Sequence, residues 1–174
     1  MTQTQDAPVD AVRTRTFSWT DPSEHVKLFV HRSGLDVLRA MAAGEVPPPP
    51  IFQLIGGAGM HVEEGSVSIT LDPQEFHYNP IGTVHGGVIS TLLDTAAACS
   101  VQSTLPAGIG YTSMDLNVKF LRPVTVATGP LTCTGSVLQQ GRRTALAEAR
   151  LTDARNRLIA HATSSCLIFD LPTP

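Results

Sequence analysis

Hydrophobic and polar positions recur with different periods along the chain, and these periods divide it into elements. From Pro22 to Ala43 apolar residues return every three to four positions, which predicts a helix with Gly34 as a possible break. Residues 66–71 alternate strictly between apolar and polar, as a half-buried strand does. Residues 86–104 are apolar nearly all round, which predicts a helix in the protein interior.

Four strands are expected in the last seventy residues. The clearest is the alternating stretch 113–120, which Pro123 closes. The other three are expected at 131–138, 144–151 and 158–169. Short links at 140–141 and 153–156 favour antiparallel hairpins. We therefore expect an α+β domain in which a helix is wrapped by an antiparallel sheet, ending in a four-strand meander.

Length and composition fit one domain in a reducing compartment. The chain has 174 residues, of which 42% are hydrophobic, enough for one sizeable core. Residues 1–22 are polar and aperiodic and predict a flexible N-terminal arm, so 23–174 form the expected domain. No secretory signal and no run of about 18 apolar residues is present, which favours the cytoplasm and no membrane contact.

Charge and ligand spacing exclude several classes of function. A net charge of -3 gives no sign of the positively charged surface that nucleic-acid binding requires. The three cysteines are far apart, and the histidines lack the spacing of metal ligands. We therefore expect no metal site, and we interpret the cysteines as buried core residues.

The stretch Asn79-Pro80-Ile81-Gly82-Thr83-Val84-His85-Gly86-Gly87 leads directly into the expected buried helix. Backbone N–H groups at a helix start have no partner within the helix, and the helix dipole attracts negative charge there. The N–H groups of Gly86 and Gly87 are therefore suited to hold a carbonyl oxygen as it becomes an oxyanion.

Asp94 is the only charged residue within 86–104. It lies too far along the helix to be an N-cap, and aspartate is a poor helix former, so local propensity does not explain it. A buried carboxylate needs a cleft, a donor or a subunit interface. Roughly 12 Å of helix separates it from Gly86, too far for one helix to bring both to one carbonyl. We expect a site between subunits, with Gly86 from one and Asp94 from the other.

Four short motifs lie one after another between residues 79 and 143. They are Asn79-Pro80-x-Gly82-x-x-His85-Gly86-Gly87, Leu93-Asp94-Thr95-Ala96, Phe120-Leu121-Arg122-Pro123 and Gly141-Arg142-Arg143. With them the chain resembles, from about Gly34 to Phe169, the hotdog thioesterases of the phenylacetate-pathway (PaaI-like) type, which are related to the 4-hydroxybenzoyl-CoA thioesterases. The resemblance implies a hotdog fold, with the sheet around helix 86–104 and an extra N-terminal helix. It also implies a homodimer, commonly paired into a tetramer.

The resemblance further implies hydrolysis of an acyl-CoA thioester to the free acid and coenzyme A. By position, Asp94 would be the nucleophile or the general base, and the sequence does not separate these routes. The Gly86 N–H would polarise the thioester carbonyl, with Gly87 beside it in the substrate site. His85 would support the carbonyl side, and Asn79 would orient the attacking water or the substrate.

Further substrate contacts are implied more loosely. Ser113 falls roughly where some relatives place a water-orienting serine. Arg122, Arg142 and Arg143 are the arginines best placed, at strand ends, to meet the phosphates of coenzyme A. Arg142 and Arg143 could equally be a solvated hairpin end. The resemblance also implies no metal and no redox cofactor; coenzyme A is part of the substrate.

Simpler interpretations stay open for each site residue. Asp94 could be satisfied by a backbone group or an interface arginine, and the glycine pair 86–87 could serve only close helix packing. His85 could be bonded to backbone, Asn79 could be only a turn former, and Ser113 an ordinary polar strand residue.

Two other functions compete with the thioesterase. One is a non-catalytic acyl-CoA binding or regulatory module on the same scaffold, because a fold does not fix a function. The other is a hotdog dehydratase or hydratase. The presence of Asp94 together with Gly86 favours the thioesterase. The acyl group remains open at this point.

Overall fold

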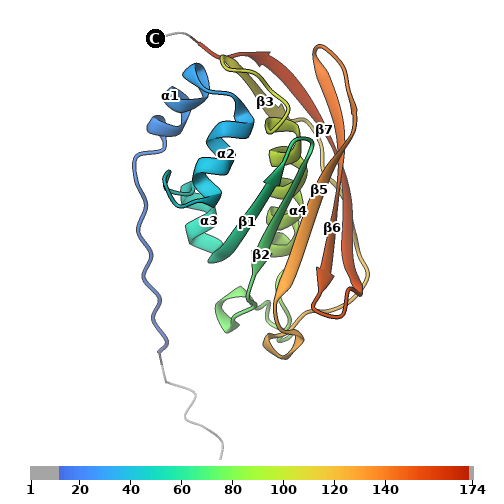
Figure 1. Cartoon of the computed structure of the whole chain (residues 1–174). Coiled ribbons are helices and arrows are strands. Elements are labelled where there is room, and N and C mark those ends of the chain that lie inside the picture. The colour runs from blue at the N-terminus through green and yellow to red at the C-terminus, as the bar shows by residue number, and fades with distance from the viewer. Residues whose placement is uncertain (1–11, 173–174) are drawn as a thin grey trace, which may run out of the picture.

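The computed structural model describes residues 12–172 as a curved antiparallel sheet that holds one long helix in its concave face (Figure 1). The helices are α1 (Ser23–His31), α2 (Gly34–Ala42), α3 (Pro50–Ile55) and α4 (Gly86–Gln102), with short 3-10 turns at Glu75–His77 and Val126–Thr128. The strands are β1 (Gly57–Glu63), β2 (Ser66–Leu71), β3 (Ile109–Ser113), β4 (Asn117–Phe120), β5 (Leu131–Gln140), β6 (Thr144–Asp153) and β7 (Leu158–Asp170). The α+β prediction is confirmed.

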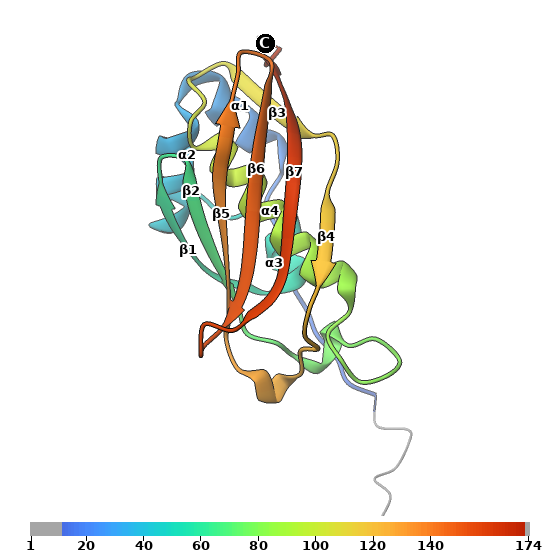
Figure 2. The same ribbon diagram turned by 90° about the vertical axis from the view of Figure 1, so that its right-hand side faces the viewer.

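The strands follow the order β1-β2-β5-β6-β7-β3, and β4 also pairs with β7 (Figure 2). The two hairpins that join β5, β6 and β7 are confirmed. The prediction of a four-strand meander is wrong, because β3 and β4 precede β5 in the chain but pair with β7 on its far side. Pairing with β7 leaves β3 and β4 together at one edge of the sheet.

Small residues on the concave face of the sheet let α4 lie close to it. The inward positions of β6 include Ala145, Ala147 and Ala149, all buried. On β5, a Cβ added to Gly135 would lie 2.0 Å from the carbonyl oxygen of Ala96, so only glycine fits where the helix backbone rests on the strand. The prediction of an interior helix is confirmed, because α4 buries residues on every side.

The predicted helix from Pro22 to Ala43 is two helices. The break falls at Arg32, whose backbone is extended with φ -130° and ψ 151°. Ser33 then caps α2 by accepting the backbone N–H of Asp36 at 3.2 Å. Gly34 is the first residue of α2 rather than the break itself.

The single strand predicted over 113–120 is also wrong, because it is interrupted between β3 and β4. Met114 still donates its N–H to the carbonyl of Ser165 at 2.8 Å. At Asp115, however, the side-chain carboxylate accepts the Ser165 N–H at 3.1 Å, and the main-chain carbonyl accepts the Ser164 hydroxyl at 2.8 Å. Side-chain hydrogen bonds thus replace the regular ladder, and the edge of the sheet opens there.

Part of the predicted N-terminal arm is bound to the domain. Arg13 pairs with Glu75 at 2.6 Å. Arg15 donates to the carbonyls of Gln53 and Leu54 at the end of α3, and its guanidinium lies 4.0 Å from the centre of the Phe76 ring. Residues 1–11 of this arm lie outside the described part of the chain. Among the helices in residues 12–172, none is long and apolar enough to cross a membrane.

Candidate active site

Asp94 lies half-buried in the middle of α4, where its carboxylate has one hydrogen-bond partner among residues 12–172. The hydroxyl of Ser113, at the end of β3, donates to Asp94 Oδ1 at 2.9 Å. Other polar side chains of this helix turn back to its backbone, as Thr91 and Thr95 do by donating to carbonyls one turn earlier. The second oxygen of Asp94 is therefore available to a ligand.

Two cavities meet at Asp94 and Ser113. The first, here called the α1 cavity, has a volume of about 370 Å³ and lies between α1, β3 and one face of α4. The second, the edge cavity, has about 380 Å³ and lies where the strand is interrupted, against Ser90, Thr91 and Asp115. Since Asp94 and Ser113 line both, a molecule in either cavity can reach the carboxylate.

Gly86 lies at a third cavity, the N-terminal cavity, which has about 300 Å³ and is bordered by Phe120 and Arg122. Within residues 12–172 its backbone N–H donates to no carbonyl or side chain, as expected for the first residue of a helix. His85 is the N-cap: its Nδ1 accepts the Gly87 N–H at 2.8 Å. The backbone N–H of Gly87 is therefore already hydrogen-bonded, whereas that of Gly86 is available to a ligand.

The side chain of Asn79 makes three hydrogen bonds within its own turn. Its Oδ1 accepts the N–H groups of Ile81 and Thr83 at 3.1 and 3.2 Å, and its Nδ2 donates to the Thr83 hydroxyl at 2.9 Å. These bonds shape the loop that delivers His85 and Gly86 to the helix start. Its predicted role in orienting water stays a prediction.

The thiol and the phenol near Asp94 are uncharged. Burial raises the pKa of the Cys99 thiol to about 12, and the Asp94 charge adds to that shift. Burial likewise raises the pKa of the Tyr111 phenol well above its usual value. Burial raises the pKa of Cys133 to about 12 as well. At neutral pH these thiols are protonated, so neither is a thiolate nucleophile.

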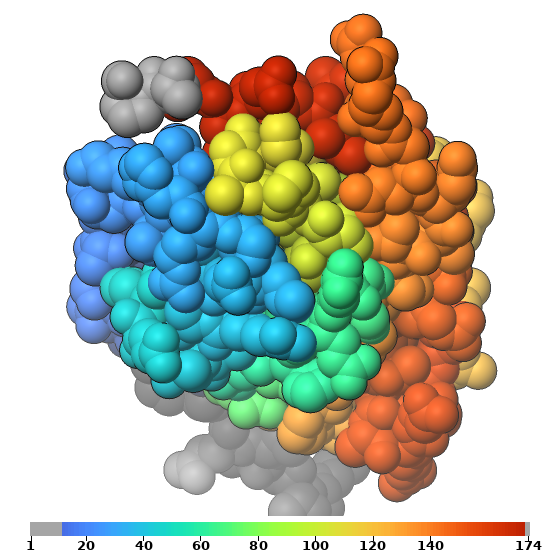
Figure 3. Space-filling view, turned by 45° about the horizontal axis from the view of Figure 1, so that its top comes forward, coloured from blue at the N-terminus to red at the C-terminus, as the bar shows by residue number. Residues whose placement is uncertain are grey.

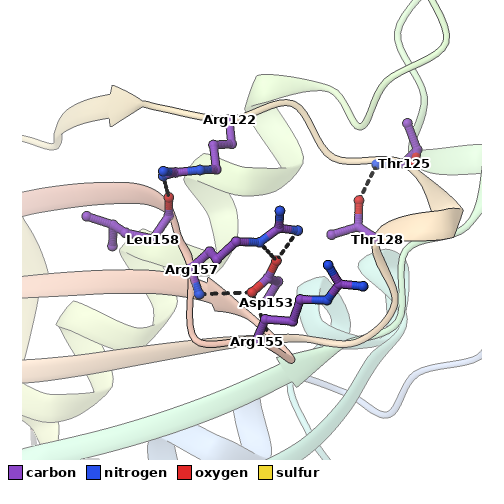
Figure 4. Close-up of polar contacts among 7 residues, drawn as sticks. All are labelled: Arg122, Thr125, Thr128, Asp153, Arg155, Arg157 and Leu158. Atoms are coloured by element: carbon purple, nitrogen blue, oxygen red, sulfur yellow. Dashed lines mark hydrogen bonds and ion pairs between the residues drawn. The ribbon is translucent and has the colours of Figure 1, made fainter.

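The arginines predicted for coenzyme A lie at opposite ends of α4. Arg122 borders the N-terminal cavity and donates to the carbonyl of Leu158 (Figure 4). Arg142 and Arg143 lie on the exposed β5–β6 hairpin, at a cavity of about 610 Å³ beside Leu105, just past the C-terminal end of α4. One subunit therefore does not bring the three together.

Sequence reasoning missed a cationic turn near Arg122. Asp153, at the end of β6, accepts the backbone N–H groups of Arg155 and Arg157 at 3.0 and 2.9 Å and the Nε of Arg157 at 2.7 Å (Figure 4). The backbone bond from Arg157, followed by its guanidinium, lowers the pKa of Asp153 below its usual value. The only signal in the sequence was the hairpin spacing itself.

A second missed residue is Gln102, which lies on the same face of α4 as Asp94 and lines the α1 cavity. It is buried, with 5% of its surface exposed. The sequence signal was present, because Asp94, Ala98 and Gln102 are four residues apart and therefore share a helix face.

The curved sheet around a helix that carries one carboxylate defines a hotdog-fold protein with a candidate hydrolytic site. Residues 81–160 match the family model described as the thioesterase superfamily. Human acyl-coenzyme A thioesterase 13 is 33% identical over 97 residues, which cover 55% of this chain and 68% of that protein. The chain belongs to this thioesterase superfamily.

Two further likenesses support this assignment. A Halobacterium salinarum protein is 42% identical over 69 residues, or 38% of this chain, and this chain spans 44% of that protein's length. The crystal structure of a phenylacetic acid degradation-related protein from Ralstonia eutropha superposes with a TM-score of 0.67 at 28% identity, covering 75% of this chain and 98% of that one. The predicted resemblance to PaaI-like hotdog proteins is confirmed.

Proposed function

We propose that this protein hydrolyses an acyl-CoA thioester, with Asp94 as the catalytic carboxylate. The observation that carries the proposal is the position of Asp94. It is the one acid on an apolar helix, held by Ser113 through a single hydrogen bond at the meeting point of two cavities. A half-buried carboxylate with one hydrogen bond costs stability, and such costly groups cluster at functional sites.

Two routes fit the geometry. Asp94 either attacks the thioester carbonyl, forming an anhydride that water then cleaves, or removes a proton from the attacking water. In both routes the C–S bond breaks, the sulfur leaves as the coenzyme A thiolate, and the acyl group ends as the free acid. The Ser113 hydroxyl fixes the orientation of the carboxylate.

The oxyanion donor in this proposal is the Gly86 N–H, since His85 already occupies that of Gly87. A donor aimed at the developing oxyanion lowers the barrier by about 3 to 4 kcal/mol. His85 supports this side of the site by fixing the first turn of the helix. In one subunit, however, Gly86 and Asp94 line different cavities.

We infer that the complete site forms between two subunits. The open edge of the sheet supports this, because Met114, Phe120 and Leu121 along it are 54%, 54% and 52% exposed. Pairing this edge with a second copy would cover these apolar side chains and could place Gly86 of one chain opposite Asp94 of the other. Coenzyme A would then meet Arg122 of one subunit and Arg142 and Arg143 of the other. Pairing of dimers into a tetramer is part of the same proposal.

Thiol release from a panel of aliphatic and aromatic acyl-CoAs tests this function. The wild-type chain should release thiol from at least one of them. Asp94→Asn, which keeps the shape but not the charge, should lower kcat by at least 100-fold while the Tm stays near that of the wild type. An unchanged rate would remove Asp94 from catalysis. No release by the wild type, with acyl-CoA still bound, would establish a non-catalytic binding module instead.

A further inference from the structure

The two cavities that meet at Asp94 differ in the chemistry of their walls. The edge cavity is lined by a second carboxylate, that of Asp115, and by the hydroxyl residues Ser90 and Thr91. In the α1 cavity Asp94 is the only charged residue among those that line it. The apolar part of its wall consists of Val26, Phe29, Ala98 and Leu171. A hydrocarbon chain therefore fits the α1 cavity better, because it would remove water from a second charged group in the edge cavity.

The α1 cavity extends from Asp94 along β3 toward α1. Ser113, which bonds to Asp94, is the last residue of β3. Beyond the other end of this strand, Gly108 donates its N–H to the carbonyl of Phe29 at 2.9 Å. Five residues of strand place the main chain of Phe29 roughly 17 Å from Ser113. On the facing helix α4, Asp94 and Gln102 both line the cavity and lie roughly 12 Å apart along the axis.

Helix α1 forms the far wall without being part of the core. None of its residues is buried. Its C-terminal end is fixed by the bond from Gly108, and the start of α2 by a bond from the Gly34 N–H to the carbonyl of Leu105 at 2.9 Å. Figure 3 shows the blue N-terminal helices against the yellow segment that follows α4. Since α1 also lies outside the matched residues 81–160, the family pattern does not account for this wall.

We propose that the acyl chain of the substrate lies in the α1 cavity and that Phe29 sets the longest chain that this protein accepts. This proposal rests on the proposed function, since it takes the thioester carbonyl to be at Asp94. An extended chain advances about 1.2 Å per bond, so roughly 12 Å of wall accommodates a straight acyl group of about eight to ten carbons. A longer chain meets the Phe29 ring, and its last methylenes gain no further burial.

The experiment measures kcat/KM for straight-chain acyl-CoAs of two to sixteen carbons. For the wild type it should rise about fourfold for each added methylene and stop rising at about eight to ten carbons. Phe29→Ala should move the maximum to longer chains and raise kcat/KM about tenfold for a chain of about fourteen carbons. Phe29→Trp should move the maximum to shorter chains. Leu28→Ala removes a neighbouring side chain of α1 that does not line the cavity, and it should keep the wild-type profile.

A binding measurement separates this proposal from the proposed function. Thioether analogues of the same lengths, which cannot be hydrolysed, should raise the Tm most at the wild-type length. The best length should shift in opposite directions in Phe29→Ala and Phe29→Trp. Such shifts without hydrolysis of any acyl-CoA would contradict only the proposed function.

The same length profile in the wild type and both Phe29 variants would overturn the role of Phe29. A second copy of the chain is the other possible occupant of this cavity. In that case Phe29→Ala would weaken the dimer on dilution and leave the length profile unchanged, which would also overturn the proposal.

Discussion

The loop that leads into α4 and the helix face that carries Asp94 differ in how their polar side chains are bonded. At the N-terminal end, the side chains of Asn79 and His85 bond to their own loop and helix start. Along the downstream face, Asp94 keeps one hydrogen bond and the Gln102 amide keeps none among residues 12–172. Groups that are bonded within their own loop shape the site, whereas the second oxygen of Asp94 is left available to a ligand. Substitutions on the two sides should therefore separate stability from activity.

After removal of the Asp94 charge, the largest effect on kcat should come from changing its hydrogen-bond partner, Ser113. Ser113→Ala removes the hydrogen bond that orients the carboxylate, and kcat should fall roughly 10- to 100-fold, because a bond to a charged group is worth about 1.5 to 3 kcal/mol. The half-buried position predicts little change in Tm. Ser113→Thr, which keeps the hydroxyl, should restore part of the rate. Equal rates for Ser113→Ala and the wild type would show that the bond has no catalytic role.

In the loop before α4, Asn79→Ala should lower the stability of the fold. It deletes three hydrogen bonds of the turn, so the free energy of unfolding should fall by about 1 to 3 kcal/mol, and the Tm by several degrees. Asn79→Asp keeps both acceptor bonds and should lose less. Thermal denaturation and kcat are measured on the same samples. An unchanged Tm with a rate as low as that of Asp94→Asn would place Asn79 in the chemistry.

The smallest effect should be a pH dependence from His77, next to the same turn. It is buried, its Nδ1 accepts the Gln74 N–H, and its Nε2 bonds the carbonyl of Ile55. Burial lowers the pKa of His77 below 6.5; the hydrogen bond to Ile55 opposes part of this shift, and Arg15 adds a smaller contribution to it. The unfolded chain therefore binds a proton more readily, and stability should fall as the pH drops below about 6.5.

Thermal denaturation between pH 5 and pH 8 measures this slope. His77→Gln should flatten it, whereas His61→Gln, at an exposed histidine of β1, should leave it unchanged. A wild-type slope that survives in His77→Gln would assign the pH dependence to another group.

Regular elements could be predicted from the sequence because their periods are strong. The buried helix and the strands at β2, β5, β6 and β7 follow directly from alternation and apolar runs. The interruption at Asp115 could not, because its carboxylate replaces a backbone partner without changing the alternation. Nor could α3, because the four prolines at 47–50 are more typical of a helix end, although Pro50 begins this helix.

The candidate site was predictable in its residues but only partly in its geometry. Asp94 and Gly86 stand out because a lone acid and a glycine pair depart from local propensity on an apolar helix. The bond from Ser113 depends on how β3 meets α4 across 19 positions of sequence, which no local pattern contains. The hydrogen bond from the Gly87 N–H to the His85 ring depends on the rotamer of His85. Gln102 escaped notice because an amide at the end of a helix is ordinary until its burial is known.

If Gly86 of one subunit and Asp94 of the other share one site, a dimer of two different variant chains should regain activity. Gly86→Pro removes the donor N–H and adds a ring, whose Cβ would lie 3.3 Å from the end of the Phe120 ring, at a first helical position that suits proline, after His85 with φ -61° and ψ 137°. Gly86→Ala is the control that keeps the N–H. Each chain is tagged differently, and the dimer of Asp94→Asn with Gly86→Pro is purified.

Both homodimers of these variants should be nearly inactive. The mixed dimer contains one intact site, formed by Gly86 of the Asp94→Asn chain and Asp94 of the Gly86→Pro chain. It should therefore recover about half of the wild-type kcat per dimer, because one of its two sites is intact. A mixed dimer as inactive as both homodimers, or full activity in a monomer, would contradict a site shared between subunits.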